Sequence, residues 1–306
     1  MKVISFLLFF LQSTAFASDL ELALNWKPEP EFGGFYLANL KGLDAKKGIQ
    51  LKIVPGGAGQ PVAQMLANGK VPLGIVSADE VLMARDRGAD LVAIFAVYQT
   101  SPVGLMTHEE KGFKSLEDFF KSDSTLAIQK GMPAAVFMER KYGYGKVKVV
   151  PYQGGVGGFI RDKNFAQQCF VTSEPLLAKK QGAKPKTFLV SESGFDPYVE
   201  VVAAKGEFVR KNPKLIQDLV EIFQAGWAAY QEDFEETNKV MNGLNPAMTL
   251  EVFNESAKVQ KPFVQPVGSK IGTMKLERWQ KFADQLFEMK LISKKAKAQE
   301  AFVSKF

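Results

Sequence analysis

Cysteine and histidine are almost absent from this 306-residue chain, which has one of each, Cys169 and His108. A single cysteine cannot form an intrachain disulfide, so the fold must depend on the burial of apolar side chains. We expect His108, in the polar segment THEEKG, to lie at the surface. One such imidazole supplies neither a histidine-based metal site nor a catalytic triad. We therefore expect no catalytic residues, no metal site and no cofactor.

Long apolar runs are missing beyond the N-terminus. The apolar run at residues 3–11 follows Met1-Lys2 and precedes the small-residue site AFA at residues 15–17, which is the three-part pattern of a secretory signal. The run is too short to cross a bilayer, which takes roughly 20 apolar residues. We predict a signal peptide at residues 1–17, cleaved after Ala17. The mature chain should then be periplasmic, without insertion into the membrane.

Charge of one sign is not concentrated in any part of the chain. The 39 Lys and Arg residues exceed the 33 Asp and Glu residues only slightly, and the basic residues are spread out, so we expect no binding to nucleic acid. The glycine-rich segments at residues 55–61 and 152–159 lack the motifs of nucleotide-binding loops. They are better interpreted as turns, in which Gly57 lets the backbone approach a ligand closely.

Short β-rich runs alternate with helical patterns over the first two thirds of the chain, which indicates an α/β fold with mainly parallel sheets. Later, residues 213–234 and 276–291 carry apolar residues at helical spacing with no strand between them. We expect two lobes, with the chain crossing between them at residues 98–103 and 194–199. The predicted strands are residues 20–24, 51–54, 73–76, 91–97, 103–107, 126–129, 148–150, 169–172, 187–190 and 199–203.

One long N-terminal segment carries a family resemblance. From residue 24 the chain reads LNWKPEPEFGGFYLANLKGLDAKKGIQLKIVPGGAGQPVAQMLANGKVPLGIVSADEVLMARDRG. This segment resembles the start of the thiamine-pyrimidine-precursor binding and synthase family, which belongs to the periplasmic solute-binding proteins of ABC transporters. The likeness continues at residues 166–182, 194–220 and 274–292, so it covers nearly all of the mature chain.

The resemblance implies a fold, a set of partners and a role. The fold is that of a type II periplasmic binding protein, with two α/β lobes joined by two crossing strands and a ligand cleft between them. Residues 18–103 and 194–306 would form one lobe and residues 104–193 the other. The partners would be a small-molecule ligand in the cleft and the membrane permease of an ABC importer, and we expect the protein to act as a monomer.

The family's usual pattern is D-W-x-P-N-x-x-H-x-G-x-Y-x-A. The chain keeps it at Trp26, Pro28, Gly34, Tyr36 and Ala38, and departs from it at Asn25, Glu29 and Phe32. Family members that synthesise the pyrimidine consume a bound pyridoxal phosphate and use that histidine together with a cysteine-rich motif. Phe32 and the solitary Cys169 therefore disfavour the enzyme.

Aromatic residues are candidates for stacking on a flat ligand. Trp26, at the end of the first predicted strand, can offer its face to a ring, and stacking of this kind is worth roughly 1–3 kcal/mol. A buried position in the core or hinge remains the alternative for Trp26. The candidate second faces are Phe32, Tyr36, Tyr152 and Tyr198.

Polar groups in a dry cleft would select the ligand, because a buried donor or acceptor left unpaired penalises the wrong molecule. A carboxylate at Glu174 would accept hydrogen bonds from an amino-substituted ring and repel a sulfonate or nitrate, although it could equally complement a helix dipole. Ser77 and Ser173 could simply cap helices, and Asp196 could brace the hinge. The polar candidates are Asn25, Ser77, Gln99, Gln153, Ser173, Glu174 and Asp196.

We therefore predict the substrate-binding component of an ABC importer that captures a small aromatic heterocycle, with a thiamine-pyrimidine precursor first. A riboflavin-like, sulfonate, taurine or nitrate ligand in the same carrier role is the alternative. A pyrimidine synthase and a non-transport interaction protein are the competing classes.

Overall fold

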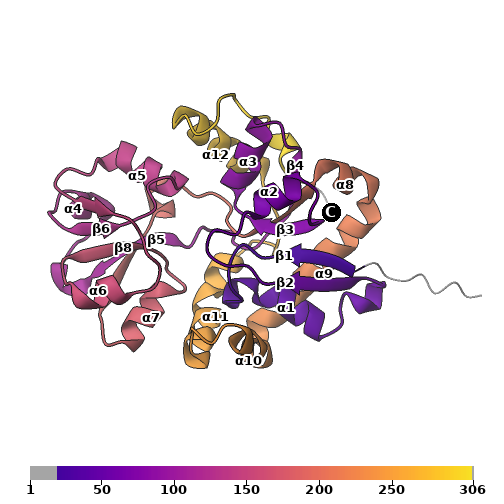
Figure 1. The fold of residues 1–306 in the computed structure, drawn as a ribbon, viewed down its shortest axis with the longest axis horizontal. Helices are drawn as coiled ribbons and strands as arrows, with labels where there is room; N and C mark the ends of the chain where they lie inside the picture. Colours follow the sequence, from indigo (N-terminus) through magenta and orange to yellow (C-terminus); the bar gives the residue numbers. More distant parts are fainter. Residues whose placement is uncertain (1–18, 305–306) are drawn as a thin grey trace, which may run out of the picture.

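The computed structural model describes residues 19–304, so the predicted signal peptide lies outside the described residues. Within them, the strands form two separate five-stranded sheets (Figure 1). Sheet A has the order β2-β1-β3-β10-β4, and sheet B has the order β7-β6-β8-β5-β9. The strands are β1 (Asp19–Ala23), β2 (Gln50–Val54), β3 (Leu73–Val76), β4 (Leu91–Ala96), β5 (Val103–His108), β6 (Thr125–Ala127), β7 (Lys148–Val150), β8 (Phe165–Phe170), β9 (Pro185–Leu189) and β10 (Val201–Lys205).

Each predicted strand has a counterpart, with β8 beginning four residues earlier than expected. The prediction of mainly parallel sheets is wrong. Strand β10 runs antiparallel to β3 and β4, and β5 runs antiparallel to β8 and β9, whereas the pairs of β1 with β2 and β3, and of β6 with β7 and β8, are parallel. The chain forms β5 and β10 directly after it passes from one sheet to the other. Each of the two strands therefore begins at the end of the sheet where its neighbouring strands finish, and runs antiparallel to them.

Two links join the sheets. Residues 97–102 connect β4 to β5, and residues 190–200 connect β9 to β10. The described residues of both links are irregular or form a short turn, so the predicted crossing strands are not strands. In the sequence, strands β1 to β4 of sheet A precede the strands of sheet B, and strand β10 of sheet A follows them. The exact lobe limits stay a prediction.

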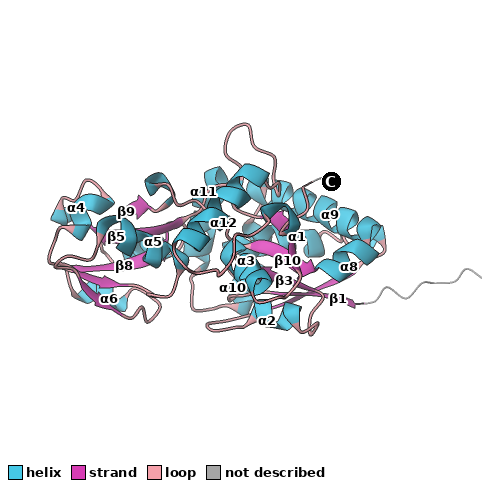
Figure 2. Cartoon of the chain, turned by 90° about the horizontal axis from the view of Figure 1, so that it is seen from above, coloured by secondary structure: helices cyan, strands magenta, loops and turns pink. Residues whose placement is uncertain are grey.

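Helices cover both sheets, and the two halves of the molecule lie side by side along its long axis (Figure 2). The apolar patterns expected at residues 213–234 and 276–291 correspond to the helices α9 and α12. No helix of residues 19–304 is long and apolar enough to cross a membrane. The helices are α1 (Gly33–Leu40), α2 (Val62–Ala67), α3 (Ala78–Asp86), α4 (Leu116–Phe120), α5 (Pro133–Tyr142), α6 (Gly157–Arg161), α7 (Glu174–Lys180), α8 (Gly206–Lys211), α9 (Pro213–Glu232), α10 (Glu235–Leu244), α11 (Leu250–Val264) and α12 (Leu276–Glu288).

Helix α1, which begins ten residues after β1, packs very closely on α9. A Cβ atom added to Gly34 would lie 2.3 Å from Cγ of Trp227, and one added to Gly226 would lie 2.3 Å from the carbonyl oxygen of Gly34. Both glycines are therefore required by the approach of the two helices. This contact fixes the segment that precedes α1, which forms one wall of the site.

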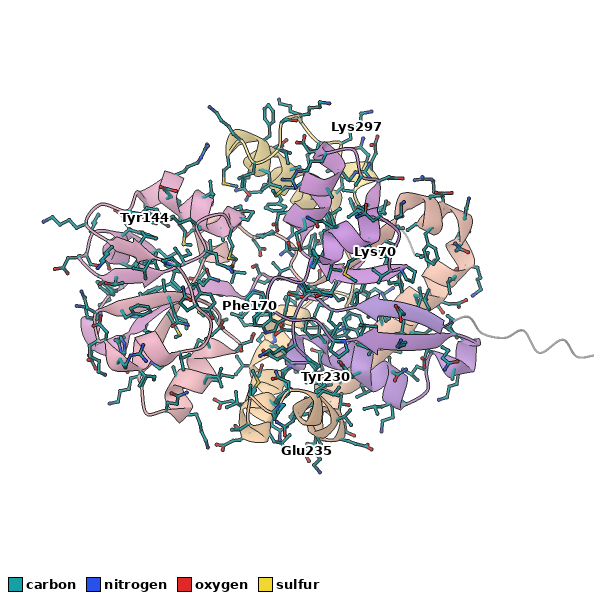
Figure 3. All side chains as sticks on the ribbon, in the orientation of Figure 1. Lys70, Tyr144, Phe170, Tyr230, Glu235 and Lys297 are labelled. Atoms are coloured by element: carbon teal, nitrogen blue, oxygen red, sulfur yellow. The ribbon has the colours of Figure 1, made fainter. Side chains whose placement is uncertain are left out.

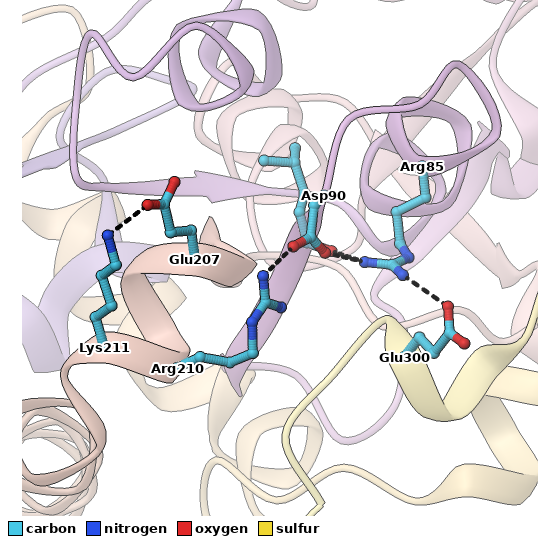
Figure 4. Close-up of polar contacts among 7 residues, drawn as sticks. Arg85, Asp90, Glu207, Arg210, Lys211 and Glu300 are labelled. Carbon is cyan, nitrogen blue, oxygen red and sulfur yellow. Dashed lines mark hydrogen bonds and ion pairs between the residues drawn. The ribbon is translucent and has the colours of Figure 1, made fainter.

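An ion network fastens sheet A at the end remote from the links (Figure 4). Asp90 accepts from Arg85 on α3 at 2.9 Å and from Arg210 on α8 at 2.8 Å, and Arg85 also reaches Glu300 at 3.1 Å. Partial burial alone would raise the pKa of Asp90, but its bonds to Arg210 and Arg85 outweigh that effect and lower it. The network joins α3, α8 and the C-terminal segment to the start of β4.

Candidate functional site

A cavity of about 360 Å³ lies between the two sheets, within the size range of small-molecule sites. Figure 3 places Phe170, at the end of β8, where the two halves meet. From the side of sheet A the cavity is lined by Asn25, Trp26, Glu29, Glu31 and Glu200. From the side of sheet B it is lined chiefly by Gln129, Met132, Tyr152, Gln168, Phe170, Ser173 and Glu174.

The loop after β1 builds the first wall. Trp26 is half-buried, and its indole Nε1 donates to Oε1 of Glu29 at 3.1 Å. Asn245 donates to the same carboxylate oxygen at 3.3 Å and to the carbonyl of Pro28 at 3.2 Å. Prolines 28 and 30 restrict the backbone of this loop. The indole is thus held in place at the cavity by its own loop and by the end of α10.

Tyr152 and Glu174 build the opposite wall. The Tyr152 hydroxyl donates to Oε1 of Glu174 at 2.8 Å, and the backbone N–H of Phe170 donates to Oε2 at 2.9 Å. Both carboxylate oxygens of Glu174 are therefore satisfied within sheet B and its helix α7. Glu174 fixes the orientation of the Tyr152 ring beside the cavity.

Four carboxyl groups line the cavity, and burial is the main reason that the pKa of each is raised. The pKa rises to about 7 for Glu29 and to about 8 for Glu200, and it lies well above its usual range for Glu31. The pKa of Glu174 is raised as well. Among the described residues, no Lys, Arg or His lines this cavity. The walls therefore offer carboxyl groups for hydrogen bonding, and no basic side chain of the described residues stands beside them.

Glu200 has an unusual backbone conformation as well as a raised pKa. Its φ is +52°, in the left-handed region that costs a residue other than glycine roughly 1–2 kcal/mol. Its carbonyl oxygen accepts from the backbone N–H of Val97 in the other link at 3.0 Å. Strained backbone of this kind concentrates at functional sites. Glu200 is thus held at the junction of both links with its carboxyl group at the cavity.

Five of the residues singled out in the sequence line the cavity, namely Asn25, Trp26, Tyr152, Ser173 and Glu174. Sequence reasoning missed Glu29, Glu31 and Glu200. Glu29 was visible as a departure from the family pattern, and Glu31 follows it in the same proline-rich loop. Glu200 gave no signal, because it stands alone at the start of the apolar run of β10.

The other candidates lie elsewhere. Phe32 is fully buried in the core, and Tyr36 is buried on α1 beside a second, separate hollow. Gly57 lies in an open turn where an added Cβ would touch nothing, and Gln153 is exposed. Ser77 forms a capping box at the start of α3. None of these five lines the cavity between the sheets.

Gln99, Asp196 and Tyr198 belong to the links. Arg278 of α12 donates to the carbonyl of Gln99 at 2.6 Å and to Oδ1 of Asp196 at 2.9 Å, and its guanidinium lies 3.9 Å from the centre of the Tyr198 ring. The same Asp196 oxygen accepts from the backbone N–H of Ser101 at 2.8 Å. Arg278 therefore clamps both links, and these three candidates brace the connection rather than line the cavity.

The expectation that His108 lies at the surface is wrong. The residue is 1% exposed, its ring stacks on that of Phe159 at 3.9 Å, and Nε2 lies 2.9 Å from the carbonyl oxygen of Phe159. The polar neighbours suggested a turn, but His108 is the last residue of β5, which lies between β8 and β9. It does not line the cavity.

The chain is similar in sequence and in fold to several known proteins. Formylaminopyrimidine-binding protein of Halalkalibacterium halodurans is 24% identical to the chain over 330 residues, which cover 99% of this chain and 98% of that protein. The periplasmic aliphatic sulphonate binding protein SsuA of Escherichia coli has a TM-score of 0.72 at 18% identity, over 92% of this chain and 96% of that one. The desulfurization enzyme DSZB has a TM-score of 0.62 at 13% identity, over 92% and 96%. The fold is thus shared by binding proteins and by an enzyme.

A family model described as NMT1/THI5 like matches residues 29–237. This range covers most of the chain and includes all four cavity carboxyls, those of Glu29, Glu31, Glu174 and Glu200. The chain belongs to the NMT1/THI5-like family.

Proposed function

We propose that this protein is the periplasmic substrate-binding component of an ABC importer and that it captures a small, amino-substituted aromatic heterocycle. A thiamine-pyrimidine precursor is the first ligand to test, because the distant relative is named for a formylaminopyrimidine. The observation that carries the proposal is the cavity between the two sheets, which combines the rings of Trp26 and Tyr152 with four carboxyl groups.

The geometry suits a flat ring with amino groups. Rings on the two walls provide apolar faces, and the carboxyl and amide oxygens around them accept hydrogen bonds from ring or exocyclic N–H groups. A ligand that touches both walls favours the closed arrangement of the two halves. The links clamped by Arg278 are where we expect the halves to rotate, and the closed form is what the membrane permease would recognise.

An anionic ligand is poorly matched to this cavity. A sulfonate or nitrate would need to lie among four carboxyl groups without a lining Lys, Arg or His among the described residues. A buried anion would be opposed by every carboxyl that is ionised and would find no lining cation to stabilise it. We therefore place sulfonate, taurine and nitrate behind the heterocycle, even though a sulphonate binder shares the fold.

A pyrimidine synthase is also less well supported than a carrier. The family's histidine position is occupied by Phe32, which is buried in the core, and the one histidine, at the end of β5, packs on Phe159 of α6. A lysine that could hold pyridoxal phosphate covalently is not among the described residues that line the cavity. The residues present suit reversible capture of a ligand better than covalent chemistry.

Thermal unfolding in the presence of a ligand panel tests the proposal. The panel contains aminopyrimidines, thiamine, riboflavin, taurine and nitrate. A ligand present at 100 times its dissociation constant should add about 2.7 kcal/mol to the free energy of unfolding. We expect an aminopyrimidine to raise the melting temperature and the anions to leave it unchanged. Stabilisation by taurine or nitrate alone would refute the heterocycle, and stabilisation by no compound would favour an interaction protein.

A further inference from the structure

Two buried acceptors at the cavity lack a partner. Nδ2 of Asn25 donates to Oε1 of Glu200 at 3.4 Å, which leaves Oδ1 of Asn25 and Oε2 of Glu200 buried without a hydrogen bond among the described residues. Glu200 is only 6% exposed. Buried polar atoms are nearly always paired, so two adjacent acceptors without donors indicate a missing ligand group. When Glu200 is ionised, that group must present N–H or O–H donors to both oxygens.

Within residues 19–304, no basic side chain is found to act on the Glu200 carboxyl. Glu29 and Glu80 act on its carboxyl electrostatically, and both disfavour its ionised form. Glu174 faces Glu29 from the opposite wall, and Lys27, an exposed neighbour in the same loop, is the basic residue that favours the ionised form of Glu29. A cationic ligand would relieve this repulsion, whereas a neutral ligand would leave it in place.

The position of Glu200 connects the ligand to the hinge. Its left-handed backbone ends the second link, and its carbonyl oxygen is bonded to Val97 in the first. A ligand group that bonds to this carboxyl therefore contacts the point where both links meet sheet A. Among the cavity carboxyls, Glu200 is the one attached directly to a link.

We infer that the ligand carries a positive charge on an N–H-bearing group, and that Glu200, with Asn25 beside it, is the residue that recognises this charge. The inference rests on the proposed function and narrows its ligand class from amino-substituted rings to cationic ones. An ammonium or an amidinium edge on the ring would place two N–H donors against the two unpartnered acceptors.

Proton release follows from this arrangement. In the empty protein Glu200 and Glu29 are partly protonated at neutral pH, because burial and neighbouring carboxyls raise the pKa of each. A bound cation favours the ionised carboxylate, so the carboxyl group loses its proton to the buffer on binding. Binding should therefore strengthen from pH 6 to pH 8 for a ligand that stays cationic over this range.

Calorimetry with a matched pair of rings tests the inference. The probes are 4-amino-5-aminomethyl-2-methylpyrimidine, whose side chain is an ammonium at neutral pH, and its neutral 5-hydroxymethyl counterpart. Titrations in phosphate and in Tris at pH 7 give the number of protons released, because the two buffers differ in ionisation enthalpy. We expect the ammonium compound to bind about tenfold or more tightly than the neutral one and to release protons.

The variant Glu200→Gln separates recognition of charge from general packing. Gln keeps the shape and removes the negative charge, so affinity for the ammonium compound should fall about ten- to hundredfold while affinity for the neutral ring changes little. Glu192→Gln, in the same link but exposed, is the matched control and should change neither. Circular dichroism and the melting temperature verify that each variant is folded, and Glu31→Gln provides a second variant of the same wall.

Three outcomes decide the inference. Tighter binding of the ammonium compound, with proton release that Glu200→Gln reduces, supports it. Equal or tighter binding of the neutral ring overturns it but leaves the proposed function standing. Absence of binding by both rings at millimolar concentration, together with stabilisation by taurine or nitrate, overturns the inference and the proposed function together.

Discussion

The indole of Trp26 is the largest side chain on the sheet A wall of the cavity, and its Nε1 is already committed to Glu29. This arrangement predicts that the ring face, rather than the N–H, meets the ligand. Replacement by alanine removes a stacking face worth roughly 1–3 kcal/mol, so affinity for the best ligand should fall about five- to 150-fold. Fluorescence or calorimetric titration measures the loss.

The control for this prediction is Trp26→Phe, which retains an aromatic face but not the bond to Glu29. It should lose less affinity than the alanine variant. An alanine variant that binds as tightly as the unmodified protein would show that Trp26 does not form the stacking surface.

The buried carboxyls predict an unusual dependence of stability on pH. A carboxyl whose pKa is raised on folding from 4.5 to about 7 or 8 stabilises the folded state while protonated, and this contribution is lost as pH rises through those values. The free energy of unfolding of the empty protein should therefore fall between pH 6 and pH 9, on the order of 2 kcal/mol. Urea unfolding at four pH values measures the slope.

Substitution identifies the groups that cause this slope. Glu29→Gln and Glu200→Gln should each flatten it and be more stable than the unmodified protein at pH 9. A stability that is constant from pH 6 to pH 9, or slopes that both variants leave unchanged, would mean that these carboxyls ionise freely in the folded chain.

Some individual site residues could be predicted from the sequence and some could not. Trp26 and Tyr152 stand at the ends of strands or in glycine-rich turns, where ligand contacts are common, and both line the cavity. Tyr198 has the same kind of position, yet Arg278, 80 positions further along the chain, covers its ring. Glu200 was hidden because its role comes from a left-handed backbone and from contact with Val97, which are tertiary properties.

At the scale of elements, the contact between α1 and α9 leaves no room for an added methyl group. Gly34→Ala places a methyl group against Trp227 and should destabilise the protein by about 1–3 kcal/mol or more, because the two helices must separate to accommodate it. Gly57→Ala is a matched control, since an added Cβ there meets nothing within 4 Å. Urea unfolding compares the two variants.

Equal stability of the two variants would contradict the close packing of α1 on α9. The comparison has a second use, because Gly57 was a sequence candidate for backbone contact with the ligand. If Gly57→Ala weakened ligand binding without a loss of stability, the turn at Gly57 would be part of the binding site.

The existence of the strands was predictable, but the direction of two of them was not. Apolar runs of suitable length identify strands wherever they pair. Whether a strand runs parallel or antiparallel depends on where the chain enters the sheet, and β5 and β10 enter from the links. Local sequence around Val103 and Val201 carries no information about that crossing. Chain length and the family resemblance predicted two lobes but not the direction of these strands.

At the scale of the whole molecule, two sheets present opposite walls to one cavity and are joined by two short links that Arg278 clamps together. Each wall is built by one half, so neither half alone can enclose a ligand. Charge is arranged on the same scale, since the chain is basic overall while the cavity is lined by carboxyls. The acidic lining of the cavity is therefore opposite in character to the basic net charge of the whole chain.

The crystal structure of the protein with an aminopyrimidine is the most direct test of the central claim. We predict that the ring lies between the two sheets, with one face on Trp26, and that an N–H group of the ligand lies within hydrogen-bond distance of Glu200. A ring bound outside this cavity, or a cavity that stays empty at saturating ligand while binding is measured in solution, would contradict the account.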